Sequence, residues 1–269
     1  MKIFVTGSSG FIGFHLSKKL LEKGHSIHGF DSMNKYYDVK LKKARLKILK
    51  EYKNFSFTKN KLENKKILTD SVLKFKPTVI MHLAAQAGVR YSIENPKAYM
   101  DSNITGTYNI IELAKKINVK HLLIASSSSV YGANKKLPFT EIDKTETQLS
   151  IYAATKKSTE SIAHSYSNIW KTPITMLRFF TVYGPWGRPD MALFKFTKAI
   201  LAGTKIPVFN YGKHRRDFTY IDDIVEGVMR VLNKAAQPNL NWNGDNPDSA
   251  SSTAPWRIYN IGNNNPVEL

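Results

Sequence analysis

The feature that most constrains this chain is a glycine-rich turn close to its start. Residues 2–6 form a short run of β-branched and aromatic side chains, and the turn Gly7-Ser8-Ser9-Gly10-Phe11-Ile12-Gly13 follows directly. An amphipathic stretch comes next, with apolar residues at helical spacing until Gly24. A strand, a glycine turn and a helix in this order bring backbone N–H groups and the positive end of a helix against a pyrophosphate. The third glycine lets the helix pack closely on the strand.

An acidic residue at the end of the next predicted strand supports a dinucleotide site. Residues 25–30 are typical of a strand, and Asp31 follows them directly. A carboxylate at this place accepts hydrogen bonds from the adenosine ribose and repels a 2′-phosphate, which favours NAD over NADP. Glycines at the spacing of Gly7, Gly10 and Gly13 also occur in ordinary turns, so a structural glycine turn is the alternative. The flanking strand and helix favour the dinucleotide site.

Apolar strands alternate with amphipathic helices from the start of the chain to about position 180. Strands are predicted at residues 78–83, 121–125 and 174–180, and helices at residues 99–117 and 151–170. Such alternation predicts an α/β protein with a doubly wound parallel sheet, that is, a Rossmann fold. We expect residues 1–180 to form the NAD-binding domain.

The pattern loosens after residue 180. Residues 191–201 and 221–232 look helical, residues 206–209 look like a short strand, and residues 237–255 look like a surface loop. We expect residues 181–269 to form a smaller substrate lobe, interleaved with the first domain. The chain stops at Leu269, shortly after Pro266, a residue suited to begin a helix, so we expect this lobe to be truncated.

Composition limits the classes of partner. The chain has 40 Lys and Arg against 21 Asp and Glu, a net charge of +19, which suits a nucleic-acid binder, an anionic substrate or a lysine-rich surface. Lysines are scattered between Lys2 and Lys76 rather than gathered in one block, so we favour the solvated surface and expect no nucleic-acid partner. The absence of cysteine excludes disulfides and thiolate sites, and the histidines lack metal spacing, so no metal is expected. No apolar run approaches the roughly 20 residues of a membrane helix, and we expect a cytoplasmic protein without a membrane partner.

A tyrosine and a lysine lie four residues apart on one predicted helix. A cation close to Tyr152, such as the ammonium of Lys156, stabilises a phenolate and makes the phenol a usable general base. This spacing is common by chance, but the pair follows a strand that ends in Ser126-Ser127-Ser128-Ser129-Val130-Tyr131-Gly132. Hydroxyls at the carboxyl end of a sheet strand lie where such folds bind ligands. The alternative is a polar transition from strand to loop.

The chain resembles the extended short-chain dehydrogenase/reductase family, in its NAD-dependent epimerase/dehydratase branch. The resemblance is carried by four features in this order: the glycine turn, Asp31, the serine run and the tyrosine–lysine pair. The resemblance covers essentially the whole chain. Residues 36–39 with residues 43–46, and residues 178–192, together with residues 82–90, are similar to the UDP-glucuronate 4-epimerases of that family.

The resemblance implies roles for individual residues. Tyr152 corresponds to the catalytic base, Lys156 to its partner and a contact of the nicotinamide ribose, and Ser127 to the catalytic serine or threonine. The implied cofactor-binding residues are Gly7, Gly10, Phe11, Ile12, Gly13, Asp31, Leu83, Ala84, Ala85, Asn103, Lys156 and Phe180. The resemblance also implies a homodimer as the usual assembly.

A UDP-sugar carries a diphosphate, and a glucuronate sugar adds a carboxylate that needs a partner when it is desolvated. Arg216 corresponds to an arginine on the diphosphate, and the alternative for its basic turn at residues 213–216 is a solvated loop or a nucleic-acid patch. For the carboxylate, Arg188 is the first candidate and Arg90 the second, although Arg188 could equally be a surface residue of a Gly/Pro loop. The implied hydroxyl donors are Ser127, Ser128, Ser129 and Thr181.

The implied reaction is 4-epimerisation of a UDP-sugar, most simply UDP-glucuronate to UDP-galacturonate, through a transient 4-keto sugar. Related dehydratases and decarboxylases carry acidic residues just before the Val-Tyr-Gly, whereas this chain has Ser128 and Ser129 there. That difference favours a reaction that stops at the ketone. The alternatives are a UDP-glucose 4-epimerase and a truncated, non-catalytic NAD-binding protein.

Overall fold

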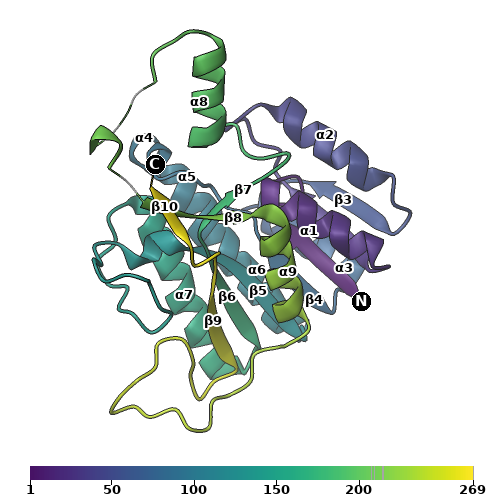
Figure 1. Cartoon of the computed structure of the whole chain (residues 1–269). Coiled ribbons are helices and arrows are strands. Elements are labelled where there is room, and N and C mark those ends of the chain that lie inside the picture. The colour runs from purple at the N-terminus through teal and green to yellow at the C-terminus, as the bar shows by residue number, and fades with distance from the viewer. Residues whose placement is uncertain (207, 209, 214, 269) are drawn as a thin grey trace.

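A twisted parallel sheet organises the computed structural model, which describes residues 1–206, 208, 210–213 and 215–268 (Figure 1). Within this described part, seven strands pair in the order β3 (Phe55–Lys59), β2 (Ser26–Asp31), β1 (Lys2–Thr6), β4 (Val79–His82), β5 (His121–Ser127), β6 (Ile174–Phe179) and β9 (Trp256–Ile261). Every neighbouring pair is parallel. The strand order reverses between β1 and β4, and in open parallel sheets ligands bind at the carboxyl ends of the strands beside that reversal.

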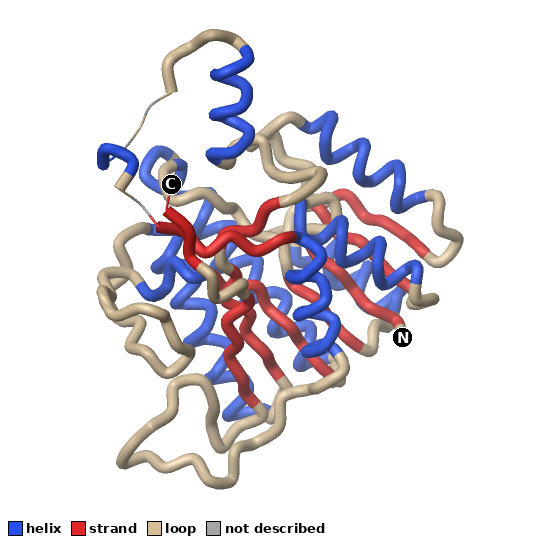
Figure 2. The backbone as a smooth tube through the Cα atoms, in the orientation of Figure 1, coloured by secondary structure: helices blue, strands red, loops and turns tan. Residues whose placement is uncertain are grey.

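Helices cover both faces of the sheet (Figure 2). Side chains of α1 (Phe11–Glu22), α2 (Val39–Lys50) and α9 (Ile221–Leu232) join one buried apolar cluster. Those of α3 (Lys65–Phe75), α6 (Gly106–Lys116) and α7 (Ile151–Trp170) join the other. The strands contribute to both clusters because successive side chains of a strand point to opposite faces. The doubly wound α/β fold expected from the sequence is therefore confirmed.

A smaller sheet lies over the carboxyl ends of the main strands. In the described part of the chain it contains β7 (Thr181–Tyr183), β8 (Arg215–Tyr220) and β10 (Pro266–Glu268), with β8 in the middle. The helix that residues around Pro266 suggested is wrong: these residues pair antiparallel with β8 as a strand. The rigid ring of proline is compatible with an edge strand as well as with a helix start. These residues form a strand because they pair with the free edge of β8.

The remaining elements are short or separate from the core. They are α4 (Tyr91–Glu94), α5 (Pro96–Tyr99), a π-helical turn (Met100–Thr105), two 3-10 turns (Ser128–Tyr131 and Asn210–Gly212) and α8 (Ala192–Leu201). None of the residues of α8 is buried, and Figure 1 shows this helix standing away from the sheet. No helix in the described residues is long and apolar enough to cross a membrane.

Several predicted bounds agree with the structure. α7 and α9 have the bounds expected from the periodicity, and α8 begins one residue later than expected. The predicted helix at residues 99–117 is interrupted by the π-helical turn. Of the predicted strand at 206–209, residues 207 and 209 lie outside the described residues, and residues 206 and 208 belong to no strand. The predicted division at residue 180 stays a prediction, but the chain does return to the main sheet through α9 and β9.

Candidate functional site

A cavity of about 570 Å³ opens at the carboxyl ends of the central strands. Segments from both halves of the chain surround it: the glycine turn, the ends of β2, β4 and β5, the first turns of α7 and the loop before α8. The expected site residues that line it are Gly7, Gly10, Phe11, Ile12, Gly13, Asp31, Leu83, Ala84, Ala85, Ser127, Tyr152, Lys156, Phe180 and Arg188. The fold thus brings the expected cofactor-binding residues and the expected catalytic residues to one cavity.

The glycine turn is packed too closely for side chains. Gly7 has a φ of +72°, and a Cβ there would lie 2.8 Å from the backbone nitrogen of Ala84. A Cβ on Gly13 would lie 2.1 Å from the carbonyl oxygen of Gly7. Gly10 caps α1 without a side-chain hydrogen bond, so this helix start leaves its N–H groups to a ligand. This cradle fits a dinucleotide pyrophosphate.

Asp31 ends β2 at the edge of the cavity. Its carboxylate accepts hydrogen bonds from the backbone N–H of Ser9 at 3.1 Å and of Met33 at 2.8 Å. Burial nevertheless raises the pKa of Asp31, while these hydrogen bonds and the charge of Lys42 act in the opposite direction. The carboxylate is fixed in place by backbone donors, as a hydrogen-bond acceptor for a ribose should be.

Lys42 is a lining residue that sequence reasoning missed. Its ammonium donates to the backbone carbonyl of Asn34 at 2.8 Å and to the side-chain oxygen of Asn34 at 2.7 Å. The ammonium also lies 4.4 Å from the centre of the Tyr37 ring. Because it is one of many lysines between Lys2 and Lys76, only its burial distinguishes it from the solvated ones.

Tyr152 lies in the first turn of α7. The hydroxyl of Ser150 accepts from the backbone N–H of Ala153 at 3.1 Å, and this N-cap starts the helix at Ile151. Burial raises the pKa of Tyr152, whereas a hydrogen bond with Ser127 and the positive charge of Arg188 lower it. The phenol and the serine hydroxyl both line the cavity.

Lys156 follows Tyr152 by one turn of α7 and is buried. Its ammonium donates to the backbone carbonyl of Ala125 at 2.8 Å. Burial lowers the pKa of Lys156 to about 8, and the carboxylate of Glu160 opposes this shift. The sequence suggested that Lys156 itself acidifies the phenol, but here the groups that lower the pKa of Tyr152 are Ser127 and Arg188.

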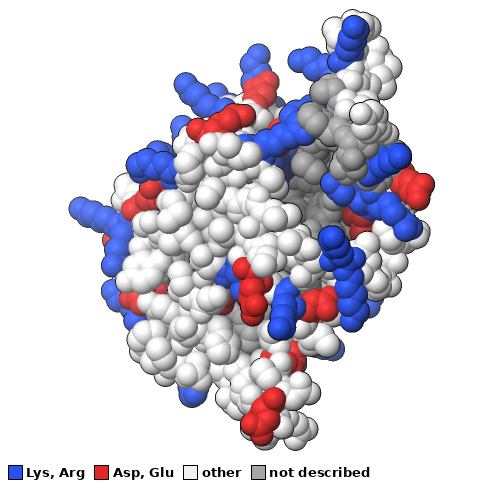
Figure 3. Space-filling model, turned by 90° about the vertical axis from the view of Figure 1, so that its left-hand side faces the viewer, with Lys and Arg blue, Asp and Glu red and all other residues white. Residues whose placement is uncertain are grey.

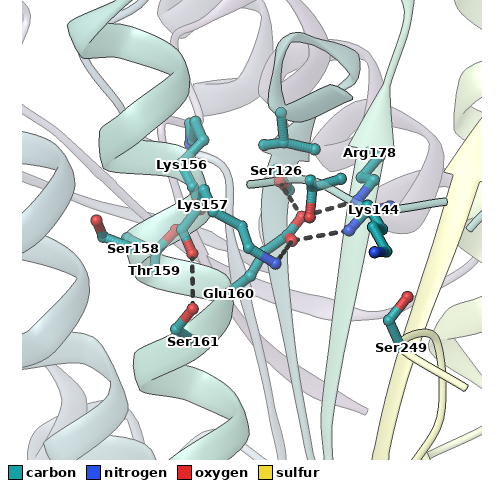
Figure 4. Close-up of polar contacts among 12 residues, drawn as sticks. Ser126, Lys144, Lys156, Lys157, Ser158, Thr159, Glu160, Ser161, Arg178 and Ser249 are labelled. Carbon is teal, nitrogen blue, oxygen red and sulfur yellow. Dashed lines mark hydrogen bonds and ion pairs between the residues drawn. The ribbon is translucent and has the colours of Figure 1, made fainter. Parts of the chain in front are cut away.

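Beneath this pair lies a buried ionic network (Figure 4). Glu160 of α7 accepts from Nε and Nη2 of Arg178, both at 2.9 Å, and from the hydroxyl of Ser126 at 2.6 Å. The side chain of Arg178 is 0 % exposed and that of Glu160 is 2 % exposed. Arg178 also donates to the hydroxyl of Tyr131 at 3.0 Å. The network ties α7 to β5 and β6 just below the catalytic candidates.

The loop before α8 contributes a second ion pair to the cavity wall. Arg188 donates from Nε to Asp190 at 3.0 Å and from Nη2 to the other oxygen of the same carboxylate. The pair is partly buried, with side chains 23 % and 17 % exposed. Arg188 is the one candidate partner of a sugar carboxylate that lines the cavity among the described residues.

Other expected site residues lie outside the described cavity lining. Asn103 is buried and bonds both the N–H and the carbonyl of Gln86, so it holds the turn after β4. Arg216 is exposed on β8 and donates to the carbonyl of Arg215. Arg90 is exposed at the start of α4. Ser128, Ser129 and Thr181 are partly buried next to lining residues, and His214 of the basic turn lies outside the described residues. The expected roles of all these residues stay predictions.

On the face that Figure 3 shows, Lys and Arg side chains are spread over the surface, with Asp and Glu among them. In the described part of the chain, no group of three or more His, Asp and Glu residues could hold a metal ion.

Comparison with known proteins agrees with this geometry. A model of the NAD dependent epimerase/dehydratase family matches residues 3–244. Protein CapI of Staphylococcus aureus is 57% identical over 269 residues, which are 100% of this chain and 80% of that protein. A protein of Rhizobium meliloti named probable UDP-glucuronate 4-epimerase is 51% identical over 273 residues, 100% of this chain and 79% of its own length.

A solved structure also resembles the chain as a whole. The UDP-glucuronic acid 4-epimerase of Bacillus cereus, in complex with UDP-glucuronic acid and NAD, superposes with a TM-score of 0.85 at 33% identity. The match covers 100% of this chain and 79% of that one. The family match spans most of the chain, including the glycine turn, Asp31 and the Tyr152–Lys156 pair, and the chain belongs to the NAD-dependent epimerase/dehydratase family.

Proposed function

We propose that this protein is an NAD-dependent 4-epimerase that converts UDP-glucuronate to UDP-galacturonate. The observation that carries the proposal is that Tyr152 and Ser127 line the same cavity as the glycine turn. A general base and a dinucleotide cradle then face the same space, as oxidation of a sugar hydroxyl requires. The relative of Rhizobium meliloti and the Bacillus cereus structure carry the same activity in their names.

The cofactor fits the residues that line the cavity. The N–H groups at the start of α1 would hold the pyrophosphate, Asp31 the adenosine ribose, and Lys156 the nicotinamide ribose. When bound, NAD supplies the capacity to take a hydride from carbon 4 of the sugar and to return it.

Proton transfer is the part of the reaction that this chain performs. The phenolate of Tyr152 takes the proton of the sugar 4-hydroxyl, and Ser127 holds that oxygen through a hydrogen bond. The flat 4-keto sugar then turns over in the cavity, so that carbon 4 is reduced on its opposite face, and Tyr152 gives the proton back to the oxygen. Release of product therefore leaves the phenolate ready for the next cycle.

The charge of Arg188 acts on both the base and the substrate. Because it lowers the pKa of Tyr152 it stabilises the phenolate, and because it lines the cavity it can pair with a sugar carboxylate. In the 3-10 turn after β5, Ser128 and Ser129 offer hydroxyls without an acid that would act at carbon 5 or 6. These features favour a glucuronate sugar and a reaction that ends at epimerisation.

The proposal is tested by incubating the chain and NAD with UDP-glucuronate and separating the nucleotide sugars by anion exchange. We expect UDP-galacturonate to appear until the two sugars reach equilibrium, with UDP-glucose converted much more slowly. Clean conversion of UDP-glucose with no UDP-galacturonate would reject the substrate assignment. Binding of NAD without conversion of any UDP-sugar would reject the enzymatic assignment for this chain.

A homodimer and a cytoplasmic location also stay proposals. Ile93 of α4 and Ile169 and Trp170 of α7 are exposed, by 75%, 61% and 46%, as a helix-mediated dimer interface would require. Light scattering of the purified chain at micromolar concentration tests the dimer, because a mass near 30.5 kDa would contradict it.

A further inference from the structure

Two segments that are far apart in the sequence meet at the wall of the cavity. One contains Tyr36, Tyr37 and Arg45, and it runs from the loop after β2 into α2. The other is the loop of residues 186–190, which contains Arg188 and precedes α8. Two independent sets of contacts join them, one through Asp190 and one through Arg45.

The first contact reaches Arg188 through its carboxylate partner. The hydroxyl of Tyr36 donates to Asp190 at 3.1 Å, and the same carboxylate accepts from Nε and Nη2 of Arg188. Asp190 thereby fixes the plane of the guanidinium from one edge, and Nη1 is the nitrogen that the pair does not use. Tyr36 and Arg188 both line the cavity.

The second contact holds the backbone of the loop. Arg45 is fully buried and donates to the carbonyl of Gly187 at 3.2 Å and to the carbonyl of Trp186. On its other side it donates to the carbonyl of Ser9 in the glycine turn at 3.0 Å and to the hydroxyl of Tyr37 at 2.8 Å. A buried guanidinium is costly unless its donors are used. Here the donors of Nη1 and Nη2 join the cofactor turn to the loop that carries Arg188, while Nε is buried without a hydrogen-bond partner.

The loop has a conformation that needs such support. Trp186 has a φ of +58°, a left-handed backbone that side chains other than glycine rarely adopt. Its carbonyl is bound by Arg45, and its ring lies 5.8 Å from that of Phe14. Without these contacts an extended conformation would be preferred, and the residue two positions later, Arg188, would move with it.

We propose that Tyr36, through Asp190, and Arg45, through the backbone of Trp186 and Gly187, are positioning residues that hold Arg188 ready for a sugar carboxylate and so set selectivity for acidic over neutral UDP-sugars. This inference rests on the proposed function. Because the Arg188–Asp190 pair carries little net charge, selectivity depends on where the guanidinium is held. An arginine that is already ordered also loses less entropy when it binds a carboxylate.

The test measures binding in a Tyr152→Phe background, where turnover is slowed about 10³-fold and the ligand is largely preserved. Calorimetry with saturating NAD gives the dissociation constants of UDP-glucuronate and UDP-glucose, and their ratio is the selectivity. We expect Tyr36→Phe to lower the selectivity about fivefold and Arg45→Lys to lower it about tenfold, since each loses hydrogen bonds to an ordered partner. The affinity of the Tyr36→Phe variant for NAD should stay within about twofold of the parent, since the hydroxyl that is removed bonds Asp190 and not the glycine turn.

Two matched controls separate positioning from general destabilisation. Tyr166→Phe removes another tyrosine–carboxylate hydrogen bond, the one to Glu112 at 2.6 Å on the helical face away from the cavity. Arg230→Lys changes an arginine of an exposed ion pair on α9. Both controls should leave the selectivity unchanged. If Arg45→Lys does not fold, Tyr36→Phe, which removes a single hydroxyl, still decides the question.

The outcomes distinguish this inference from the proposed function. If the parent shows no preference for UDP-glucuronate, or if Arg188→Ala leaves the preference intact, the proposed substrate contact is wrong. If Arg188→Ala abolishes the preference but Tyr36→Phe and Arg45→Lys keep it, the contact stands and the positioning inference is overturned. A loss of selectivity in all three variants, with unchanged controls, supports both.

Discussion

At the scale of single residues, the account depends on the hydroxyl of Tyr152. The phenyl ring lies edge-on to Tyr99, with ring centres 6.1 Å apart, so phenylalanine fits the same place. We expect Tyr152→Phe to lower kcat by about 10³-fold, the range typical for removal of a general base. Binding of NAD, followed by calorimetry, should be unchanged. A variant that keeps more than a tenth of the parental kcat would contradict the role of this phenol.

The ammonium of Lys156 gives the reaction a dependence on pH. Its pKa is lowered to about 8, so the group is charged below that pH and becomes neutral above it. Loss of the charge removes the cation that we propose to bind the nicotinamide ribose. We expect kcat to fall as the pH rises through about 8, and the fall should be absent in Lys156→Arg, whose side chain stays protonated. An identical alkaline limb in both proteins would show that another group titrates.

The cofactor-binding and catalytic residues could be predicted from the sequence because each of their patterns lies within a short stretch of the chain. The glycine turn, Asp31 and the pair four residues apart are patterns within single elements, and all of them line the cavity. Sequence reasoning missed Glu160, Lys42 and Arg45, whose roles depend on burial and on partners far away in the chain. A lysine or an arginine on a basic helix gives no sign of its burial in the sequence.

At the scale of elements, Glu160 and Arg178 hold α7 against β5 and β6. On α7, Tyr152, Lys156 and Glu160 succeed each other at four-residue intervals. Lys156 donates to the carbonyl of Ala125, and Glu160 accepts from the hydroxyl of Ser126, both at the end of β5. Hydrogen bonds thus bind the helix to the strand at two of these three turns. The ion pair at the lowest of these turns sets the register of the two above it.

A double-mutant cycle tests this arrangement. Glu160→Gln leaves the buried Arg178 without its carboxylate, and Arg178→Met leaves the buried Glu160 with the more distant ammonium of Lys157, at 3.7 Å. Each should therefore lower the free energy of unfolding, by up to about 3–5 kcal/mol. The double variant removes both charges and should lose less than the sum of the two single changes. Denaturation by urea measures each value. Strictly additive losses would contradict a direct pairing, and the exposed pair Glu226–Arg230 is the control, with an expected loss below about 1 kcal/mol per variant.

Elements were predicted well where their periodicity was strong. α7 and α9 have long amphipathic patterns, and their observed bounds equal the expected ones. β9 was not predicted, because it follows a long polar loop and its place at the edge of the main sheet depends on pairing with β6, a strand from much earlier in the chain, in which Ile174 is the partner of Trp256. The helix expected at Pro266 failed for the same reason, since pairing with β8 is a non-local contact.

At the scale of the whole molecule, buried neutral histidines make stability depend on pH. His28, His82 and His121 are all at most 9% exposed, and burial lowers their pKa values to about 4, about 3 and about 4. In the unfolded chain each titrates near its ordinary value, about 6.5. Below that pH the unfolded state binds more protons than the native state, so stability is complete above about 6.5 and falls as the pH decreases.

We therefore expect the free energy of unfolding to fall by up to about 5 kcal/mol between pH 7 and pH 5, as the unfolded state takes up nearly three protons. Thermal unfolding measured across this range gives the slope. His121→Gln should reduce the slope by about a third, because glutamine does not titrate. A melting temperature that does not change between pH 7 and pH 5 would show that the three histidines titrate alike in both states.

The position of the cavity follows from the topology of the sheet. The reversal of strand order between β1 and β4 creates the cavity, the cofactor turn closes it from one side, and the loop of residues 186–190 closes it from the other. Arg45 joins these two sides through buried contacts. Catalysis at carbon 4 thus requires both halves of the chain to meet, as they do here.

The most direct test of the central claim follows the hydrogen at carbon 4 of the sugar. UDP-glucuronate labelled with deuterium at carbon 4 is incubated with the chain and NAD in ordinary water, and the product is examined by NMR. The account predicts UDP-galacturonate that keeps the deuterium at carbon 4, because the hydrogen leaves and returns without contact with solvent. Product that has lost the deuterium to water, or product inverted at another carbon, would contradict it.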